Sequence, residues 1–113
     1  LIHSSRGVAV MAHPYLFGGG NIELLDELIE SKKLDGIEVF HYSADEDKQR
    51  YLLEKCGQNG LIATGGSDFH GLYNSVPTHI GSSYTDDVNI KLLLAKIAEN
   101  KQRIKKSAVV NNE

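Results

Sequence analysis

Asp68 and His70 form the most suggestive polar pair in the sequence, within the segment GGSDFHG (65–71). Residues two apart in an extended segment face the same way, so this carboxylate and this imidazole can converge on one cation. A mixed set of oxygen and nitrogen donors suits Zn, Mn or Fe. Gly65 and Gly66 before the pair allow another backbone segment to approach closely, and Gly71 after it permits a sharp turn of the chain. The alternative is that Asp68 makes a turn hydrogen bond and His70 is exposed.

Three further residues could join this pair. His13 follows the apolar run VAVMA (8–12) and precedes a proline, so the chain turns there; a hydrogen-bonded structural histidine is the alternative. Glu38 lies inside the apolar stretch GIEVF (36–40), and burying an unpaired carboxylate costs several kcal/mol. It therefore needs a partner, which is a metal, a metal-bound histidine, a backbone donor or a lysine. His41 comes directly after that stretch and belongs either to the site or to the loop surface.

The elements that position these residues follow from the apolar pattern. Short apolar runs predict buried strands over 8–12, 36–40 and 61–64. Helices are expected between them, over 22–33 and 44–57, and a third is expected from Thr85 onward.

The caps of these helices are predicted from residue type. Asn21 is the expected N-cap of the first helix and Thr85 that of the last. Ser43 and Glu46 have the capping-box spacing, and Gly57 offers a left-handed C-terminal cap. An irregular loop is expected over 72–84, and the final Asn-Asn-Glu is expected to be frayed.

Strands that alternate with helices indicate an α/β fold with a parallel sheet and right-handed crossovers. The carboxyl ends of parallel strands share one rim, so His13, Glu38 or His41, and Asp68 with His70 are expected to meet there. The pattern alone is compatible with a doubly wound sheet or with part of a β/α barrel.

The composition excludes several other classes. The chain has 113 residues, which is one domain at most, and its 12 basic against 15 acidic residues give a charge of −3. It lacks the basic stripe of a nucleic-acid binder, so we expect no stable nucleic-acid complex. No apolar run approaches the ~18 residues of a membrane span. The lone Cys56 can form no intrachain disulfide, which favours a reducing, cytoplasmic setting.

The segments GVAVMAHP (7–14), LDGIEVFH (34–41) and TGGSDFHG (64–71) together resemble the C-terminal half of the PHP (polymerase and histidinol phosphatase) superfamily. They are most similar to its metal-dependent phosphoesterases, whose characterised members hydrolyse nucleotide phosphates and short oligoribonucleotides. The resemblance covers residues 1 to about 84, leaving 85–113 as a terminal helix and tail of the same domain.

The resemblance implies a distorted (β/α)7 barrel with two or three divalent metal ions at the C-terminal rim. Asp68 and His70 match the Asp-x-His metal ligands that come last in the family's sequence, and these also take part in catalysis. His13 matches a ligand of another metal ion. Glu38 matches a residue that supports the metal ligands or positions the substrate. His41 is placed with Glu38 as a second-tier candidate site residue. The implied substrate is a phosphorylated small molecule or nucleotide.

The chain also departs from the family pattern, because it contains no His-x-His motif. Three candidate ligands are too few for a complete binuclear centre, and three strands cannot close a barrel. We therefore expect the missing half before Leu1, and we expect the chain alone to be at most a weak single-metal binder. Exposed strand edges and apolar faces would favour self-association. The alternatives are a non-catalytic binding or regulatory module and an amidohydrolase-type metal-dependent hydrolase.

Overall fold

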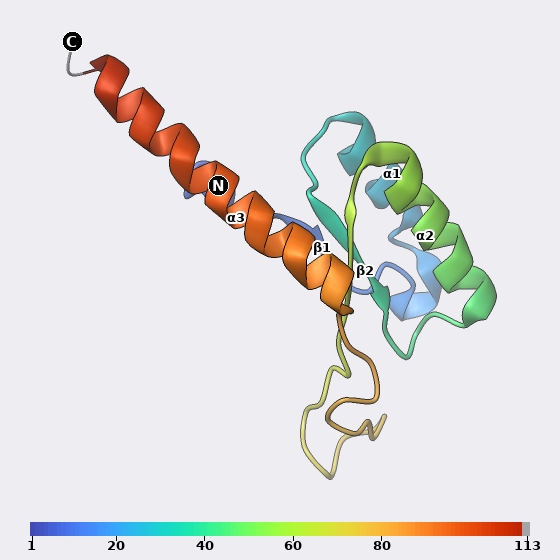
Figure 1. Cartoon of the computed structure of the whole chain (residues 1–113). Helices are drawn as coiled ribbons and strands as arrows, with labels where there is room; N and C mark the ends of the chain where they lie inside the picture. Colours follow the sequence, from blue (N-terminus) through green and yellow to red (C-terminus); the bar gives the residue numbers. More distant parts are fainter. Residues whose placement is uncertain (112–113) are drawn as a thin grey trace.

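The computed structural model describes residues 1–111, with side chains described for residues 1–103. Its strands and helices alternate along the chain as predicted (Figure 1). In chain order they are β1 (Val10–Met11), the 3₁₀ helix η1 (Leu16–Gly19), α1 (Ile22–Glu30), β2 (Gly36–Phe40), α2 (Glu46–Asn59), β3 (Ile62–Gly65) and α3 (Asp87–Asn111). The α/β class is therefore confirmed. The frayed tail predicted at the C-terminus lies, from residue 112 on, outside the described residues.

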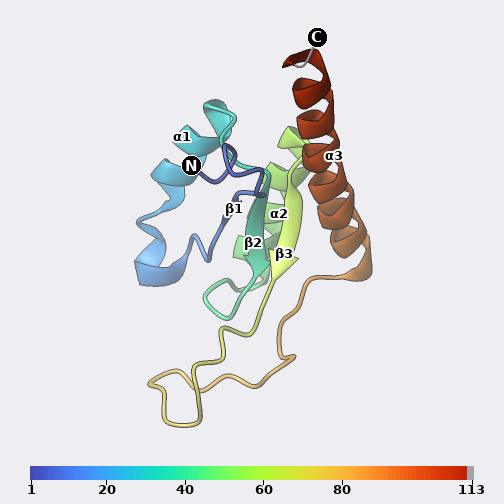
Figure 2. The ribbon, with the colours of Figure 1, turned by 90° about the vertical axis from the view of Figure 1, so that its left-hand side faces the viewer.

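The three strands form one parallel sheet in the order β1-β2-β3, and they lie side by side in Figure 2. Val10 pairs with Gly36, which pairs in turn with Ile62. Each strand is thus added beside the previous one, which is the order that a β/α barrel requires. The pairing is regular up to Glu38 and shifts by one residue before Phe40.

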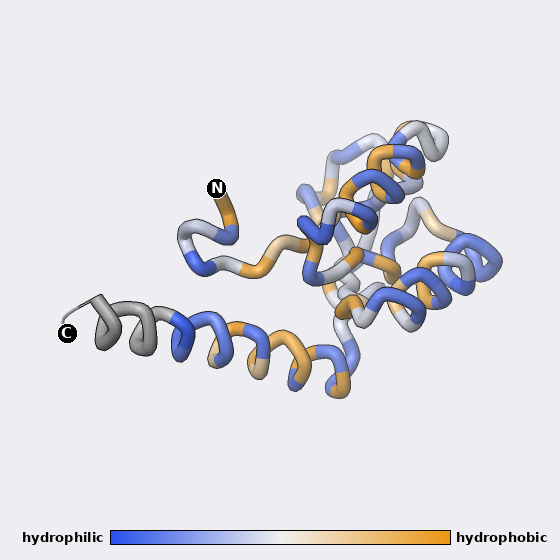
Figure 3. Tube along the Cα trace, turned by 90° about the horizontal axis from the view of Figure 1, so that it is seen from above, coloured by the Kyte–Doolittle hydropathy of each residue, from blue (hydrophilic) through white to orange (hydrophobic). Residues whose placement is uncertain are grey.

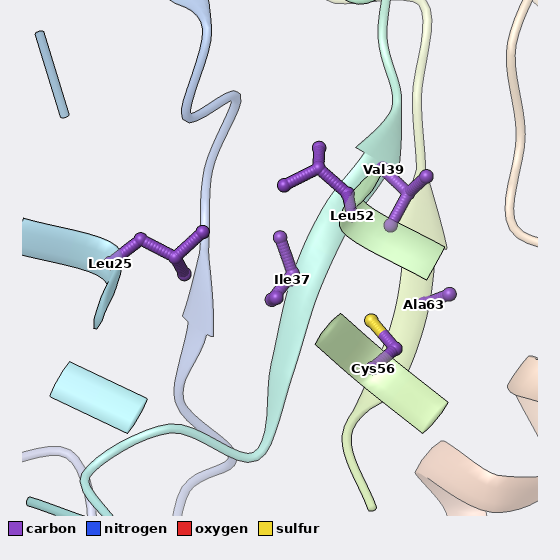
Figure 4. Packing of buried hydrophobic residues seen from close by; sticks show 6 residues of the cluster. All are labelled: Leu25, Ile37, Val39, Leu52, Cys56 and Ala63. Atoms are coloured by element: carbon purple, nitrogen blue, oxygen red, sulfur yellow. The ribbon is translucent and has the colours of Figure 1, made fainter. Parts of the chain in front are cut away.

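The core lies on one face of this sheet. Ile37 and Val39 alternate with Glu38 along β2, so they point to the face opposite to that of Glu38. Both are fully buried against side chains of the two crossover helices (Figure 4). The whole buried cluster consists of Leu25, Ile37, Val39, Leu52, Cys56 and Ala63. Because α1 and α2 cover the same face, Glu38 is left on the face that becomes the inside of a barrel.

The first strand is shorter than the predicted run 8–12. Asp35 ends the pairing early, since its Oδ2 accepts a hydrogen bond from the Ala9 N–H at 2.8 Å. The Ala9 carbonyl in turn accepts from the backbone N–H groups of Asp35 and Gly36. The helix predicted over 22–33 ends at Glu30, where the Ser31 hydroxyl donates to the Glu27 carbonyl.

Two helix starts differ from the prediction by one or two residues. Asp45 caps α2, with its carboxylate accepting from the Lys48 N–H, so Ser43 is free for another role described below. Asp86 accepts from the Asn89 N–H at the start of α3, where Thr85 was the expected cap. In both cases a carboxylate nearer to the first turn accepts the bond in place of a hydroxyl.

The predicted C-terminal cap at Gly57 is wrong. Gly57 lies inside α2, and the helix continues to Asn59. Gly60 takes the left-handed conformation, with φ 63°, and ends the helix. Both glycines satisfy the local pattern, but only Gly60 takes the left-handed conformation, and β3 begins two residues after it, at Ile62.

Side chains around the start of α3 cover the outer edge of β3. The Ala63 N–H donates to Asn89 Oδ1 at 2.9 Å, and the Gly65 N–H donates to Thr85 Oγ1 at 3.0 Å. Gly66 and Tyr84 add an isolated antiparallel bridge. This edge of the sheet is thus not open for strand pairing in the way the sequence suggests.

Beyond its first turns α3 extends past the sheet (Figures 1 and 2), and apolar residues recur along its first part (Figure 3). Apolar side chains along it remain exposed, with Val88 at 68% and Leu94 at 60%. Self-association through such faces stays a prediction. Within the described residues, no helix combines the length and the hydrophobicity that crossing a membrane would need.

Candidate metal site

The C-terminal ends of the strands bring four of the five candidate side chains into contact. His41, just after β2, places Nε2 3.0 Å from Oδ2 of Asp68, which follows β3. His70 places Nδ1 3.0 Å from the other oxygen, Oδ1. His13, after β1, lies with its ring centre 5.0 Å from that of His41. Residues from three strands therefore meet at one rim, as parallel strands require.

Strained backbone marks the same place. Within residues 1–111, five non-glycine residues have positive φ, and three of them line one shallow pocket: His13 (23°), Phe17 (61°) and Asp68 (53°). The pocket has a volume of about 330 Å³. Its other lining residues are Leu16, Tyr42, His70, Asn74, Ser75 and Val76. The other two, Arg6 and Lys32, line a separate hollow, so the strained residues around this pocket are three, and strain of this kind is often found at functional sites.

His13 is held by its backbone and has an unused ring nitrogen. Its N–H donates to Glu38 Oε1 at 3.1 Å, while its Nδ1 is buried without a hydrogen-bond partner in the described structure. A buried nitrogen in that state is costly unless something binds it. This fits the predicted role of His13 toward a metal. The sequence left four kinds of partner open for Glu38. The structure shows one of them, a backbone donor, which is the N–H of His13.

His41 is buried, with only 1% of its surface exposed, so a place on the loop surface is wrong. Its Nδ1 accepts a hydrogen bond from the Ser43 N–H at 3.1 Å and lies 2.7 Å from Ser43 Oγ. The turn over 41–44 that brings these groups together is closed by the Ala44 N–H donating to the His41 carbonyl. Ser43, which the sequence predicts as a capping-box residue of α2, thus contacts His41 instead.

The Asp68 carboxylate is kept ionised. The hydrogen bond from His41 lowers the pKa of Asp68 below its ordinary value, and the charges of His70, His41 and His13 act in the same direction against the effect of burial. His70 is 63% exposed, so its ring faces solvent as the alternative interpretation expected, yet it contacts Asp68. An ionised carboxylate beside imidazoles is a donor set suited to Zn, Mn or Fe.

The described side chains do not form a complete metal centre. Among the residues the structure describes, no group of three or more His, Cys, Asp or Glu side chains is arranged to hold an ion. His13, Asp68 and His70 fit a metal by their chemistry and by the unused nitrogen of His13, but they do not form a complete coordination shell. The expectation that further ligands come from outside this chain stays a prediction.

Sequence reasoning missed two features of this rim. Phe17 is 85% exposed and lines the pocket. Tyr42 lines the pocket and contacts the His41 ring, with centroids 4.2 Å apart. The position of Tyr42 directly after His41 in the sequence was an available signal, whereas Phe17 comes four residues after His13 and had no such signal.

Comparison with known proteins agrees with this geometry. No family model matches the chain. A phosphoribosyl 1,2-cyclic phosphate 1,2-diphosphodiesterase from Eggerthella lenta is 39% identical over 75 residues, which is 66% of this chain and 27% of that protein. A crystal structure from Bifidobacterium adolescentis, provisionally described as a metal-dependent phosphoesterase, matches with a TM-score of 0.70 and 31% identity. The match covers 84% of this chain and 34% of that one.

The two matches support the resemblance of the chain to the C-terminal portion of a PHP-superfamily phosphoesterase. The chain spans about a quarter to a third of the length of the proteins it matches, which fits a correspondence to the C-terminal portion of a PHP domain. The sequential parallel sheet with both crossover helices on one face is the corresponding portion of a PHP barrel. Glu38 and the rim residues then belong to the inside and the mouth of that barrel.

Proposed function

We propose that the PHP protein containing this chain is a metal-dependent phosphoesterase, which hydrolyses a phosphate ester of a nucleotide or another small molecule. The observation that carries the proposal is the contact of Asp68 with both His41 and His70 at the strand ends, next to the unused Nδ1 of His13. The names of the two relatives support a phosphorylated substrate and the use of a metal.

The roles of the residues follow from their positions. Asp68, His70 and His13 would hold divalent metal, whether Zn, Mn or Fe, together with ligands from the rest of the PHP domain. When bound, such ions activate water and neutralise charge on a phosphoryl group. Asp68 contributes a fixed, ionised carboxylate, and Glu38 holds the backbone of His13. His70, the most exposed of these, lies where a substrate would enter.

The pocket supports a small substrate. Its volume of about 330 Å³ is at the lower end of the range that is usual for small-molecule sites. Phe17 and Tyr42 supply apolar surface beside the charged rim. A mononucleotide-sized ester therefore fits better than a long nucleic acid, and the lone, buried cysteine is compatible with the cytoplasmic setting that we propose.

A non-catalytic PHP module that binds phosphorylated ligands is the alternative function, and the test below distinguishes it from the phosphoesterase. An amidohydrolase-type reaction gains no support from either relative.

The test uses the natural protein that contains this chain, loaded with Mn²⁺, Zn²⁺ or Fe²⁺. We expect phosphate-ester hydrolysis of nucleotides or cyclic phosphates, measured as released phosphate or opened ring. Asp68→Ala should lower this activity about 100-fold or more, because it removes a metal-binding carboxylate. Asp47→Ala is the matched control, since that carboxylate is 89% exposed on α2, and it should leave activity unchanged. Activity that survives Asp68→Ala contradicts the proposal, and ligand binding without turnover supports the non-catalytic alternative.

A further inference from the structure

His41 is a buried polar side chain whose two ring nitrogens both have partners. Its exposed fraction is 1%, although it comes directly after a strand at the rim of the site. A polar ring buried to this degree is stable only when its nitrogens are hydrogen-bonded. The two partners, Ser43 and Asp68, lie on opposite sides of the ring, since one contacts Nδ1 and the other Nε2.

The contact with Ser43 determines where the ring proton lies. The Ser43 backbone N–H points at His41 Nδ1 at 3.1 Å, and a backbone N–H can only donate. Nδ1 is therefore an acceptor and carries no proton. In the neutral ring the proton must then lie on Nε2, and Nε2 is the atom 3.0 Å from Asp68 Oδ2.

This proton gives the Asp68 carboxylate a defined orientation. Oδ2 accepts from His41, while Oδ1 lies toward His70 and the open pocket. The His41 ring is packed against the rings of His13 and Tyr42, at centroid distances of 5.0 and 4.2 Å, so it cannot turn freely. Oδ1, which contacts the exposed His70 ring and not His41, is thus the oxygen that a cation held together with His70 would bind.

We propose that His41 is a positioning residue, which holds Asp68 by its Nε2–H so that Oδ1 faces the metal, and that it does not itself bind the ion. The proposal rests on the proposed function, in which Asp68 binds metal. A ligand role for His41 would require either the Ser43 or the Asp68 hydrogen bond to break. The Ser43 hydroxyl, 2.7 Å from Nδ1, can either donate or accept, so the backbone N–H is the group that fixes the position of the proton.

The first test needs no metal and no activity. Nitrogen-15 NMR of the imidazole rings in the natural protein, treated with a chelator, should show His41 with a protonated Nε2 and an unprotonated Nδ1. Ser43→Ala keeps the backbone N–H and should leave this pattern unchanged. A proton on Nδ1 of His41 overturns the proposal, and it does so whether or not the protein is a phosphoesterase.

The second test measures the Mn²⁺ or Zn²⁺ dissociation constant by competition with a chromophoric chelator. His41→Leu should weaken binding about 10- to 100-fold, as is usual when a residue that orients a ligand is lost. His41→Gln, whose amide N–H can replace Nε2–H, should recover most of that loss. His79→Leu is the control, because His79 is an exposed histidine in the loop after the site, and it should change nothing.

The outcomes separate the two proposals. If Asp68→Ala weakens metal binding but His41→Leu does not, His41 has no positioning role and the proposed function stands. Equal losses in His41→Gln and His41→Leu also overturn the positioning role, because a replacement donor should rescue. If Asp68→Ala leaves metal binding unchanged, the proposed function fails, and the positioning role fails with it. A His41→Leu protein that does not fold leaves the glutamine variant and the NMR measurement to decide.

Discussion

The Glu38 carboxylate on β2 accepts a hydrogen bond from the backbone N–H of His13, at 3.1 Å, just beyond the end of β1. The second oxygen of Glu38 lies beside Gly66, where an added Cβ would be 3.6 Å away. Glu38 thus bridges the ends of all three strands on the inner face of the sheet. It also holds His13 in its unusual backbone conformation, with φ 23°.

We expect Glu38→Ala to weaken metal binding by the natural protein about 10-fold, because the backbone of His13 loses its anchor. Glu38→Gln retains an oxygen acceptor and should have a smaller effect. The measurement is the dissociation constant for Mn²⁺ from chelator competition. Glu54→Ala, an exposed glutamate on α2, is the control. An unchanged dissociation constant in Glu38→Ala would show that this contact does not support the site.

Gly65 and Gly57 should respond in opposite ways to alanine. A Cβ at Gly65 would overlap the Tyr84 carbonyl oxygen and lie 2.6 Å from Phe40 Cβ, so Gly65→Ala should lower the free energy of unfolding by about 1–3 kcal/mol. A Cβ at Gly57 meets nothing within 4 Å, and Gly57→Ala should stabilise α2 by about 0.5–1 kcal/mol. Urea unfolding followed by circular dichroism measures both. A destabilised Gly57→Ala protein would contradict the placement of Gly57 inside the helix.

Asp35 should make stability depend on pH. It lies in a hollow of about 1440 Å³ between the N-terminal segment and α3. Burial alone would raise the pKa of Asp35, but hydrogen bonds from the Ala9 N–H and His3, with the charge of Lys96, lower it below its ordinary value of 3.8. A carboxyl group with a lower pKa in the folded state stabilises the fold above its unfolded pKa, and this contribution is lost as pH falls through the folded pKa.

The free energy of unfolding should therefore fall as pH is lowered below about 4, and Asp35→Asn should make that fall less steep. The variant should also be less stable than the parent at pH 7, where the parent's carboxylate is ionised. Asp47→Asn, at an exposed carboxylate, should follow the parent curve. Parallel curves for Asp35→Asn and the parent would exclude Asp35 as a source of the acid sensitivity.

Cys56 should be unreactive in the folded protein. Burial raises the pKa of its thiol from 9.0 to about 11, which lowers the thiolate fraction at pH 8 about 100-fold. Reaction with a disulfide reagent should be slow in buffer and fast in denaturant, as followed by absorbance. Rapid reaction under native conditions would mean that α2 separates readily from β3.

Residues 1–113 by themselves should show no appreciable phosphate-ester turnover. The described residues hold only part of a metal-binding set, and the sheet has three strands. Phosphate release by this segment, compared with the natural protein at equal concentration, is the measurement. Efficient hydrolysis by the segment would contradict the view that the site needs ligands from elsewhere.

The amino-acid sequence by itself determined the order of strands and helices and the positions of the candidate ligands. Short apolar runs with β-branched residues favour buried strands, and each run here is followed within four residues by a polar rim residue, such as His13 or Asp68. Because parallel strands share one carboxyl edge, local pattern was enough to place these residues at the same rim. The PHP resemblance rested on the same three segments.

Only the tertiary structure decided how those residues contact one another. His41 is separated from Asp68 by 27 positions and Glu38 from His13 by 25, and no local pattern encodes such pairs. Likewise, the choice of Gly60 over Gly57 as the end of α2 depends on the register of β3 with β2. Sequence spacing reports which side chains share a face, whereas hydrogen-bond partners and buried nitrogens depend on how separate elements pack, which is a property of the whole fold.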